Sequence, residues 1–321
     1  MQKIRVGVVR GGPSSEYEVS LKTGENVLRA LRGDRYLPID ILLTKNGEWY
    51  MNGTQTDLGH IATHVDVVWN ALHGTFGEDG KVQKLFEHFG IPYTGSASLA
   101  SAVGMHKGLA KDRFEKEGLL VPLGDVVWGG QSGSARASFP QLSQRPFPFI
   151  VKPVTGGSSV ATAIVHNDTE LAEALLAAAE FGDVLVEEVI RGKEATVCVV
   201  DGWSDGEYFV LFPIEIVPPS SKEVFDYEAK YSGISEEICP GRFTLSVHAD
   251  LRDLAVKAHR AIGARHYSRT DFIISDKGIY VLEINTLPGL TSESLVPKAL
   301  RAGGVEFHEF LDHIIGLTLQ P

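Results

Sequence analysis

Two carboxylates and an amide lie near one another in the last quarter of the chain, between Arg269 and Asn285. Alternating residues on either side of Ser-Asp-Lys-Gly predict two short strands joined by a turn over 275–278. Along the second strand, alternation predicts one face with four side chains: Ile279, Val281, Glu283 and Asn285. Asp271 and Ile273 share a face of the first strand. If the two faces coincide, Asp271, Glu283 and Asn285 converge at one end of the hairpin.

Three oxygen ligands, two of them carboxylates, suit a hard cation that keeps some waters and bridges phosphates of a substrate. Mg²⁺ and Mn²⁺ are the ions with that preference. The same spacing also fits a hairpin end whose acidic residues face water. The residue pattern alone leaves both interpretations open.

A lysine and a glycine-serine loop form a second candidate site. Lys152 ends an apolar run that Pro153 stops, and Thr155-Gly-Gly-Ser-Ser159 follows. Consecutive small residues let backbone N–H groups approach an anion closely. The loop lacks the Gly-Lys-Ser/Thr ending of a Walker A sequence, so an ordinary Gly-Ser hairpin also fits. Lys152 directly before the loop favours phosphate.

The elements that position these residues begin with a doubly wound α/β unit. An apolar run over 4–9, a Gly/Ser loop over 10–16 and a helix over 18–31 follow in that order, and ligands of such units lie at strand carboxyl ends. The loop is not G-x-G-x-x-G, which gives a nicotinamide cofactor little support. A second buried strand over 65–72 ends at His73. That position suits a functional residue, although a histidine bonded to a neighbouring loop fits it too.

Further elements alternate along the rest of the chain. We expect one helix over 98–118, strands over 121–127, 146–152, 184–190, 193–200 and 209–217, and a helix over 169–179 capped by Asp168 or Thr169. Glu187 and Glu188 are adjacent in one strand, so one of them points inward and needs a partner such as a lysine or a ribose hydroxyl. A long polar segment around 225–232 suggests a lid.

Composition bounds the class of protein. The 321 residues suffice for two or three domains, and 43% hydrophobic with 22% charged residues is typical of a soluble globular protein. A net charge of −11 without a basic stripe argues against nucleic acid as a partner. We find no signal-peptide pattern and no run of 18 apolar residues, so we expect a cytoplasmic protein without a membrane partner. Cys198 and Cys239 match no metal or redox spacing and are expected to be buried free thiols.

Six stretches, in order and at matching separations, resemble the D-alanine–D-alanine ligases of the ATP-grasp superfamily. They are Ala71-Leu-His-Gly74 with Gly77-Glu-Asp-Gly80, Pro92-Tyr-Thr-Gly-Ser96, Ile150-Val-Lys-Pro153, Gly157-Ser-Ser-Val160, Tyr227-Glu-Ala-Lys-Tyr231 and Glu283-Ile-Asn-Thr-Leu-Pro-Gly-Leu-Thr-Ser292. The resemblance implies an α/β, three-domain ATP-grasp architecture with an N-terminal doubly wound parallel sheet. The expected domains are an N-terminal α/β domain (1–104), a central ATP-grasp subdomain (105–189) and a C-terminal ATP-grasp subdomain (190–321).

The implied reaction joins two D-alanines at the expense of ATP, for peptidoglycan precursor synthesis. ATP phosphorylates the carboxylate of the first D-alanine, and the amine of the second attacks the acylphosphate. Such phosphoryl transfer depends mostly on positioning and on charge neutralisation. Two Mg²⁺ or Mn²⁺ ions on Asp271, Glu283 and Asn285 would bridge the phosphates. The family also implies a homodimer.

The resemblance assigns roles residue by residue. The expected nucleotide contacts are Lys107 and Lys152 at the phosphates and Glu187, Glu188, Ile190, Glu194 and Lys230 around the rest of ATP. Glu16, Ser158 and Tyr231 match a hydrogen-bonded trio that receives the first D-alanine, and His73 lies near it. Arg269 is expected to stabilise the oxyanion of the tetrahedral intermediate. Gly289, Ser294 and Leu295 match the pocket of the second D-alanine.

The sequence departs from the family at four positions. Thr155 and Gly156 stand where Arg and Glu are usual, Ala161 replaces a frequent glycine, and His106 replaces a common Asp. These changes bear on nucleotide affinity more than on the reaction. Glu-Ala-Lys-Tyr favours an amine as the second nucleophile. Another ATP-grasp carboxylate–amine ligase, one making D-alanyl-D-lactate or D-alanyl-D-serine included, and a non-catalytic nucleotide-binding module are the alternatives.

Overall fold

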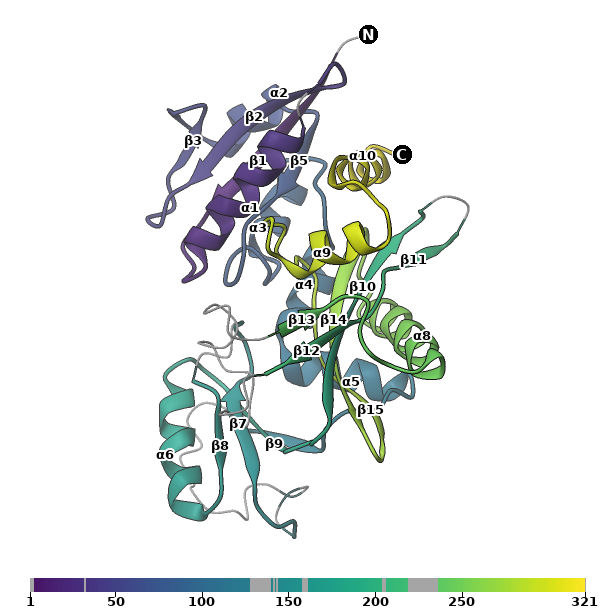
Figure 1. Cartoon of the computed structure of the whole chain (residues 1–321). Coiled ribbons are helices and arrows are strands. Elements are labelled where there is room, and N and C mark those ends of the chain that lie inside the picture. Colours follow the sequence, from purple (N-terminus) through teal and green to yellow (C-terminus); the bar gives the residue numbers. More distant parts are fainter. Residues whose placement is uncertain are drawn as a thin grey trace.

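The computed structural model describes residues 3–31, 33–127, 140, 142, 144–157, 161–203, 206–218 and 236–320 (Figure 1). Three β-sheets organise these residues, with helices packed on them. Ser158, Lys230 and Tyr231, and with them the expected lid around 225–232, lie outside the described residues. Within the described ranges, no helix combines the length and the apolar character needed to cross a bilayer.

The N-terminal sheet is doubly wound, as predicted. Its elements are β1 (Ile4–Gly11), α1 (Tyr17–Ala30), β2 (Tyr36–Leu43), β3 (Trp49–Met51), β4 (Thr54–Thr56), α2 (Leu58–His64), β5 (Val67–Asn70) and α3 (Lys81–His88). The strand order is β4-β3-β2-β1-β5, and β1 runs parallel to β2 and β5. Val8 of β1 packs in one core with α1, whereas Val9 packs in another with α3. Both faces of β1 are therefore buried. Next to this sheet, Tyr93 forms an isolated parallel bridge to Val68.

The central sheet is antiparallel, in the order β6-β9-β7-β8. Its elements are β6 (Gly124–Val127), β7 (Phe149–Pro153), β8 (Ala163–Val165), α6 (Asp168–Ala179) and β9 (Val184–Glu188). The N-cap of α6 is Asn167, whose side chain accepts from Glu170 N at 3.0 Å, so the expected cap at Asp168 or Thr169 is wrong by one or two residues.

The third sheet carries the hairpin. Its elements are β10 (Lys193–Asp201), β11 (Tyr208–Val210), β12 (Ile214–Val217), β13 (Glu236–Ile238), α8 (Leu245–Ala261), β14 (Tyr267–Ser275) and β15 (Gly278–Asn285). The order is β13-β12-β10-β14-β15, with β11 also paired to β10. The single strand expected over 209–217 is thus two strands, β11 and β12.

The helix expected over 98–118 is divided into α4 (Ser98–Met105) and α5 (Lys107–Lys116). His106 leaves the helical conformation, with φ −92° and ψ 97°, and its side chain accepts from Leu109 N as the N-cap of α5. Both helices pack on the third sheet, where Val103 and Phe114 share a core with Leu251 of α8. The break makes Lys107 the first residue of α5.

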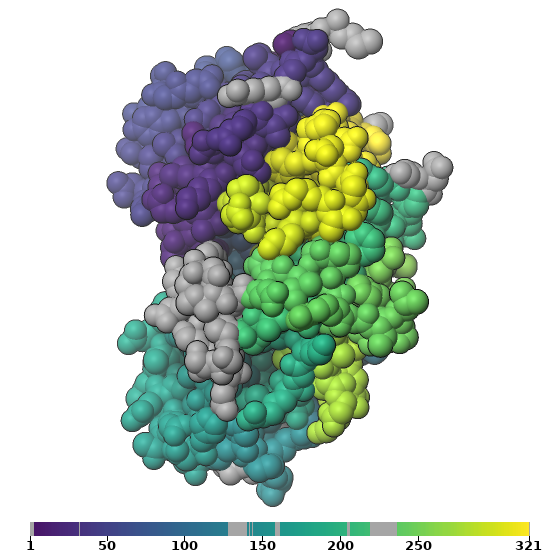
Figure 2. All heavy atoms as spheres, in the orientation of Figure 1, coloured from purple at the N-terminus to yellow at the C-terminus, as the bar shows by residue number. Residues whose placement is uncertain are grey.

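The last helices return the chain to the N-terminal sheet. They are α9 (Leu295–Ala302) and α10 (Phe307–Thr318). Phe310 of α10 lies 6.2 Å from the Trp69 ring on β5 and 5.4 Å from the Tyr267 ring on β14. In Figure 2 the yellow C-terminal segment accordingly lies against the purple N-terminal lobe. This aromatic core joins the first and third sheets.

A β-bulge alters the predicted hairpin. Asp271 lies opposite Glu283 and Arg269 opposite Asn285, as convergence of the polar residues requires. Between Asp271 and Phe272 the register shifts, so that Phe272 pairs with Val281 and one extra residue enters β15. Val281 is consequently buried in the core below the sheet, where Ile279 also packs. The prediction that these two residues share a face with Glu283 is wrong.

Candidate active site

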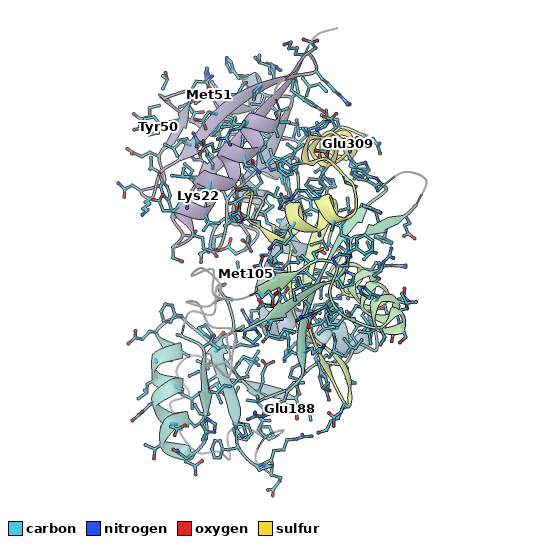
Figure 3. The ribbon with its side chains drawn as sticks, viewed as in Figure 1. Lys22, Tyr50, Met51, Met105, Glu188 and Glu309 are labelled. Atoms are coloured by element: carbon cyan, nitrogen blue, oxygen red, sulfur yellow. The ribbon has the colours of Figure 1, made fainter. Side chains whose placement is uncertain are left out.

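One cavity of about 1220 Å³ is lined by strands of the central and third sheets and by α1 and loops next to the N-terminal sheet. Lys22 on α1 and Glu188 at the end of β9, both labelled in Figure 3, line it from opposite lobes. Every expected site residue that the structure describes lines this cavity: Glu16, His73, Lys107, Lys152, Glu187, Glu188, Ile190, Glu194, Arg269, Asp271, Glu283, Asn285, Gly289, Ser294 and Leu295. The fold therefore brings together residues that are up to 279 positions apart, from Glu16 to Leu295.

The hairpin presents its oxygen atoms from two facing strands. Asp271 and Glu283 are directly opposite, and Asn285 lies one pair further on. The Asn285 side-chain oxygen accepts from Leu287 N at 2.7 Å, which fixes the amide and leaves one lone pair of that oxygen. Among the described residues, no three His, Cys, Asp or Glu side chains form a group that could hold a metal ion. A cation here would need the Asn285 amide and oxygens of its substrate besides the two carboxylates, which fits a phosphate-bridging ion.

Arg269 and Asp271 hold each other in place. Arg269 Nε and Nη2 donate to the two carboxylate oxygens of Asp271 at 3.0 and 2.9 Å. Thr196 Oγ1 on β10 donates to the same carboxylate at 2.5 Å. Burial by itself would lower the pKa of Arg269, but the facing Asp271 carboxylate outweighs it and raises that pKa above its ordinary value. A guanidinium fixed in this way on the cavity wall is suited to meet a developing negative charge.

Lys107 connects the start of the glycine-serine loop, at Gly156, with the hairpin. Its backbone N–H donates to Val154 O at 3.0 Å, and its Nζ donates to Gly156 O at 2.8 Å. The same Nζ lies 3.6 Å from Glu283 Oε2. Gly156 has φ +113°, a backbone conformation that residues other than glycine rarely adopt. Glycine therefore suits the backbone at this position, where the resemblance leads one to expect Glu. Ala161 has φ +52°, a conformation that glycine adopts with less strain.

The prediction that one of the adjacent glutamates needs an inward partner is confirmed. Glu187 is buried, and its Oε2 lies 2.5 Å from Lys152 Nζ. Lys111 forms a second ion pair with Glu187. Glu188 instead accepts from Leu123 N at 3.0 Å and pairs with Arg145 at 2.8 Å. The partners of the inward carboxylate are therefore two lysines.

His73 lies between two polar side chains. Its Nε2 is 2.9 Å from Thr23 Oγ1, and its Nδ1 is 3.4 Å from Glu78 Oε1. Glu78 also accepts from Gly74 N at 2.9 Å. Glu16 is nearby, since a methyl group built on Gly74 would lie 2.8 Å from its Oε2. The loop that follows β5 and the loop between β1 and α1 thus meet at the cavity.

The loop before α9 is held by hydrogen bonds within it and by one to α1. Ser294 is the N-cap of α9, yet its side chain makes no capping bond. Its Oγ instead accepts from Thr291 N at 3.1 Å and lies 2.8 Å from Thr291 Oγ1. Asn26 of α1 donates to Leu290 O at 2.7 Å and ties the loop to the N-terminal lobe. The first N–H groups of α9 can therefore face an anion in the cavity.

Sequence reasoning missed four residues that support the site: Thr23, Glu78, Lys111 and Thr196. One signal was present, because Lys107 and Lys111 are four residues apart and share a helix face. Thr23 and Thr196 carry no such signal, since their partners come from distant strands and loops.

Comparisons with known proteins agree with this geometry. A family model described as D-ala D-ala ligase C-terminus matches residues 131–316, and one described as D-ala D-ala ligase N-terminus matches residues 5–63 and 52–96. A D-alanine–D-alanine ligase of Desulforudis audaxviator is 40% identical over an alignment of 321 positions that covers 98% of each chain.

Solved structures show the same fold. The VanG D-Ala:D-Ser ligase from Enterococcus faecalis has a TM-score of 0.87 at 30% identity, covering 99% of this chain and 100% of that one. The D-alanine–D-alanine ligase from Bacillus anthracis complexed with ATP has a TM-score of 0.81 at 30% identity, covering 98% and 97%. On the strength of both family models and of a curated relative matched over nearly its whole length, the chain belongs to the D-alanine–D-alanine ligase family.

Proposed function

We propose that the cavity joins two D-alanines with ATP, giving D-alanyl-D-alanine, ADP and phosphate for peptidoglycan precursor synthesis. The observation that carries the proposal is the single cavity in which all described candidate residues meet. A carboxylate oxygen of the first D-alanine attacks the γ-phosphorus of ATP, and ADP leaves. The amine of the second D-alanine then attacks the acylphosphate carbon, loses a proton, and phosphate leaves.

In this proposal the nucleotide lies between the central and third sheets. Lys107 and Lys152 neutralise phosphate oxygens, and Glu187, Glu188, Ile190 and Glu194 surround the adenosine part together with Lys230. Asp271, Glu283 and Asn285 would hold two Mg²⁺ or Mn²⁺ ions. Such ions, when bound, neutralise charge on the transferred phosphoryl group. The facing carboxylates and the fixed amide support this ligand set.

The amino-acid substrates occupy the side of the cavity nearer the N-terminal lobe. Glu16, with Ser158 and Tyr231, receives the ammonium of the first D-alanine, and His73 lies beside it. Arg269 stabilises the oxyanion formed when the second amine attacks, an effect whose loss typically costs about 10²–10³ in rate. Gly289, Ser294 and Leu295 bind the second D-alanine, and its carboxylate meets the N–H groups at the start of α9.

Phosphate release with ATP and a panel of amino acids tests the proposal, with each product identified by mass. We expect turnover to require both ATP and D-alanine and the product to be the dipeptide. Equal turnover with L-alanine would contradict it. Because a D-Ala:D-Ser ligase shares the fold, D-serine and D-lactate are included, and preference for either as second substrate would favour that specificity instead.

The architecture of the whole protein is also proposed. The domains are residues 1–104, 105–189 and 190–321, and two copies form a homodimer. The division between 189 and 190 falls between the central sheet, which ends with β9, and the third sheet, which begins with β10. Sedimentation equilibrium at micromolar concentration tests the dimer, which a single species of 34.9 kDa would contradict.

A further inference from the structure

A buried lysine next to the nucleotide side of the cavity has no role in the proposed reaction. Lys111 lies on α5, and its side chain is only 9% exposed. It forms an ion pair with Glu187 and donates to Pro122 O at 3.1 Å. Glu187 and Lys152 line the cavity, whereas Lys111 contacts Glu187 from outside the cavity wall. A long cationic side chain is rarely buried without a partner, so its position calls for a reason.

Two lysines share one carboxylate. Glu187 Oε2 faces Lys152 Nζ at 2.5 Å, and Lys111 is paired with Oε1. Lys152 and Glu187 are diagonal neighbours on one face of the central sheet, since Lys152 pairs with Leu185. Burial, and then the charge of Lys152, lower the pKa of Lys111. This effect of Lys152 reflects repulsion between the two ammonium groups, and an anion in the cavity would attract Lys152.

We propose that Lys111 is a positioning residue that keeps Glu187 neutralised while Lys152 moves from Glu187 to the phosphates of ATP. The inference rests on the proposed function, in which Lys152 contacts phosphate. Without Lys111, the departure of Lys152 would leave a buried carboxylate uncompensated, which is strongly unfavourable. Lys152 would then stay on Glu187, and the phosphates would lose one of their two lysine partners.

Substitution Lys111→Met keeps the length of the side chain and removes its charge. We expect the KM for ATP to rise on the order of 10- to 100-fold, as when a residue supporting a ligand from behind is removed. The KM for D-alanine and kcat at saturating ATP should change little. The affinity for adenosine, which has no phosphate to draw Lys152 from Glu187, should fall less than the affinity for ATP. The matched control is Lys116→Met on the exposed side of the same helix, which should leave both KM values unchanged.

The double variant Lys111→Met/Glu187→Gln separates this role from a merely structural one. A neutral amide holds Lys152 less strongly than a carboxylate and needs no neutralising partner, so the affinity for ATP should return to that of Glu187→Gln alone. If the two single effects simply add, or if Lys111→Met binds ATP like the wild type, the inference is overturned. Should Lys111→Met fail to fold, Lys111→Gln is measured in the same cycle by direct ATP binding. Absence of turnover in the wild type would overturn the proposed function instead, and binding of ATP would still test Lys111.

Discussion

At the scale of single residues, the hairpin end shows how few groups set the chemistry. Asp271 is held by Arg269 and by Thr196, and Asn285 is held by the backbone of Leu287. Asp271 and Asn285 thus have a fixed orientation before any cation arrives. Preorganised polar groups need not reorient during the reaction, which is the basis of their electrostatic effect.

Asn285→Ala tests the proposed metal site. The variant loses an oxygen ligand, so we expect the Mg²⁺ concentration for half-maximal turnover to rise by about tenfold or more, each tenfold being about 1.4 kcal/mol. Asn285→Asp keeps an oxygen that can accept from Leu287 N and should have a smaller effect. The measurement is turnover at limiting and at saturating Mg²⁺.

The control for the metal site is Asp276→Asn, which changes an exposed acidic residue at the other end of the hairpin. Its Mg²⁺ dependence should equal that of the wild type. If Asn285→Ala also keeps the wild-type dependence, Asn285 is not a ligand. The thermal midpoint of each variant shows whether loss of the bond to Leu287 has altered the fold.

At the scale of elements, the sequence determined which segments are strands and helices better than where they break. The hairpin and its turn were predictable, because alternation and turn residues are local signals. The bulge after Asp271 was not, since the extra residue in β15 is fixed by packing of Phe272 and Val281 against the core. The break at His106 was missed for a different reason, because histidine is not a usual N-cap and so gave no local signal.

The burial of Lys111 belongs to the same group of missed features. Its pattern is that of an exposed helical lysine, and only the packing of α5 beside the central sheet gives it Glu187 as a partner. Most expected site residues, by contrast, were identified by resemblance. The fold then placed all those it describes on one cavity.

The cap at His106 gives a prediction for α5. Asp is a better N-cap than His, and a negative charge is favourable at a helix N-terminus. We expect His106→Asp to raise the free energy of unfolding by about 0.5–1 kcal/mol and His106→Ala to lower it by about 1 kcal/mol. Urea unfolding measures both. Equal stabilities of His106→Ala and the wild type would mean that the bond to Leu109 N contributes nothing.

At the scale of the whole molecule, the third sheet is the part that packs against the N-terminal sheet and its helices on one side and against α4 and α5 on the other. Its strand β14 contacts β5 and α10 through Tyr267, and α4 and α5 pack on its other face. The cavity lies where the third sheet meets the central sheet and the loop between β1 and α1. The affinity for substrates that contact the central sheet, the third sheet and α1 would therefore depend on how these parts are held relative to one another.

One histidine next to the third sheet makes stability depend on pH. His266 Nδ1 accepts from Gly95 N at 3.0 Å, which links the N-terminal region to the start of β14. Burial, and then the charge of Arg265, lower its pKa from 6.5 to about 4. Between these values the unfolded chain binds the proton and the folded protein does not. The neutral His266 side chain thus contributes up to about 3 kcal/mol to the free energy of unfolding. This contribution is fully present above pH about 6.5 and is lost as the pH falls towards 4.

His266→Asn isolates this contribution. Asparagine tolerates the positive φ of 68° at this position, and its amide oxygen can accept from Gly95 N without titrating. The free energy of unfolding should therefore fall less steeply in the variant than in the wild type between pH 6.5 and 4, while carboxylates protonate in both. Urea unfolding at several pH values, with the exposed His60→Asn as control, measures the difference. If the free energy of unfolding of His266→Asn and of the wild type falls in parallel with pH, His266 does not contribute to the pH dependence of stability. Its pKa would then be the same in the folded protein and in the unfolded chain.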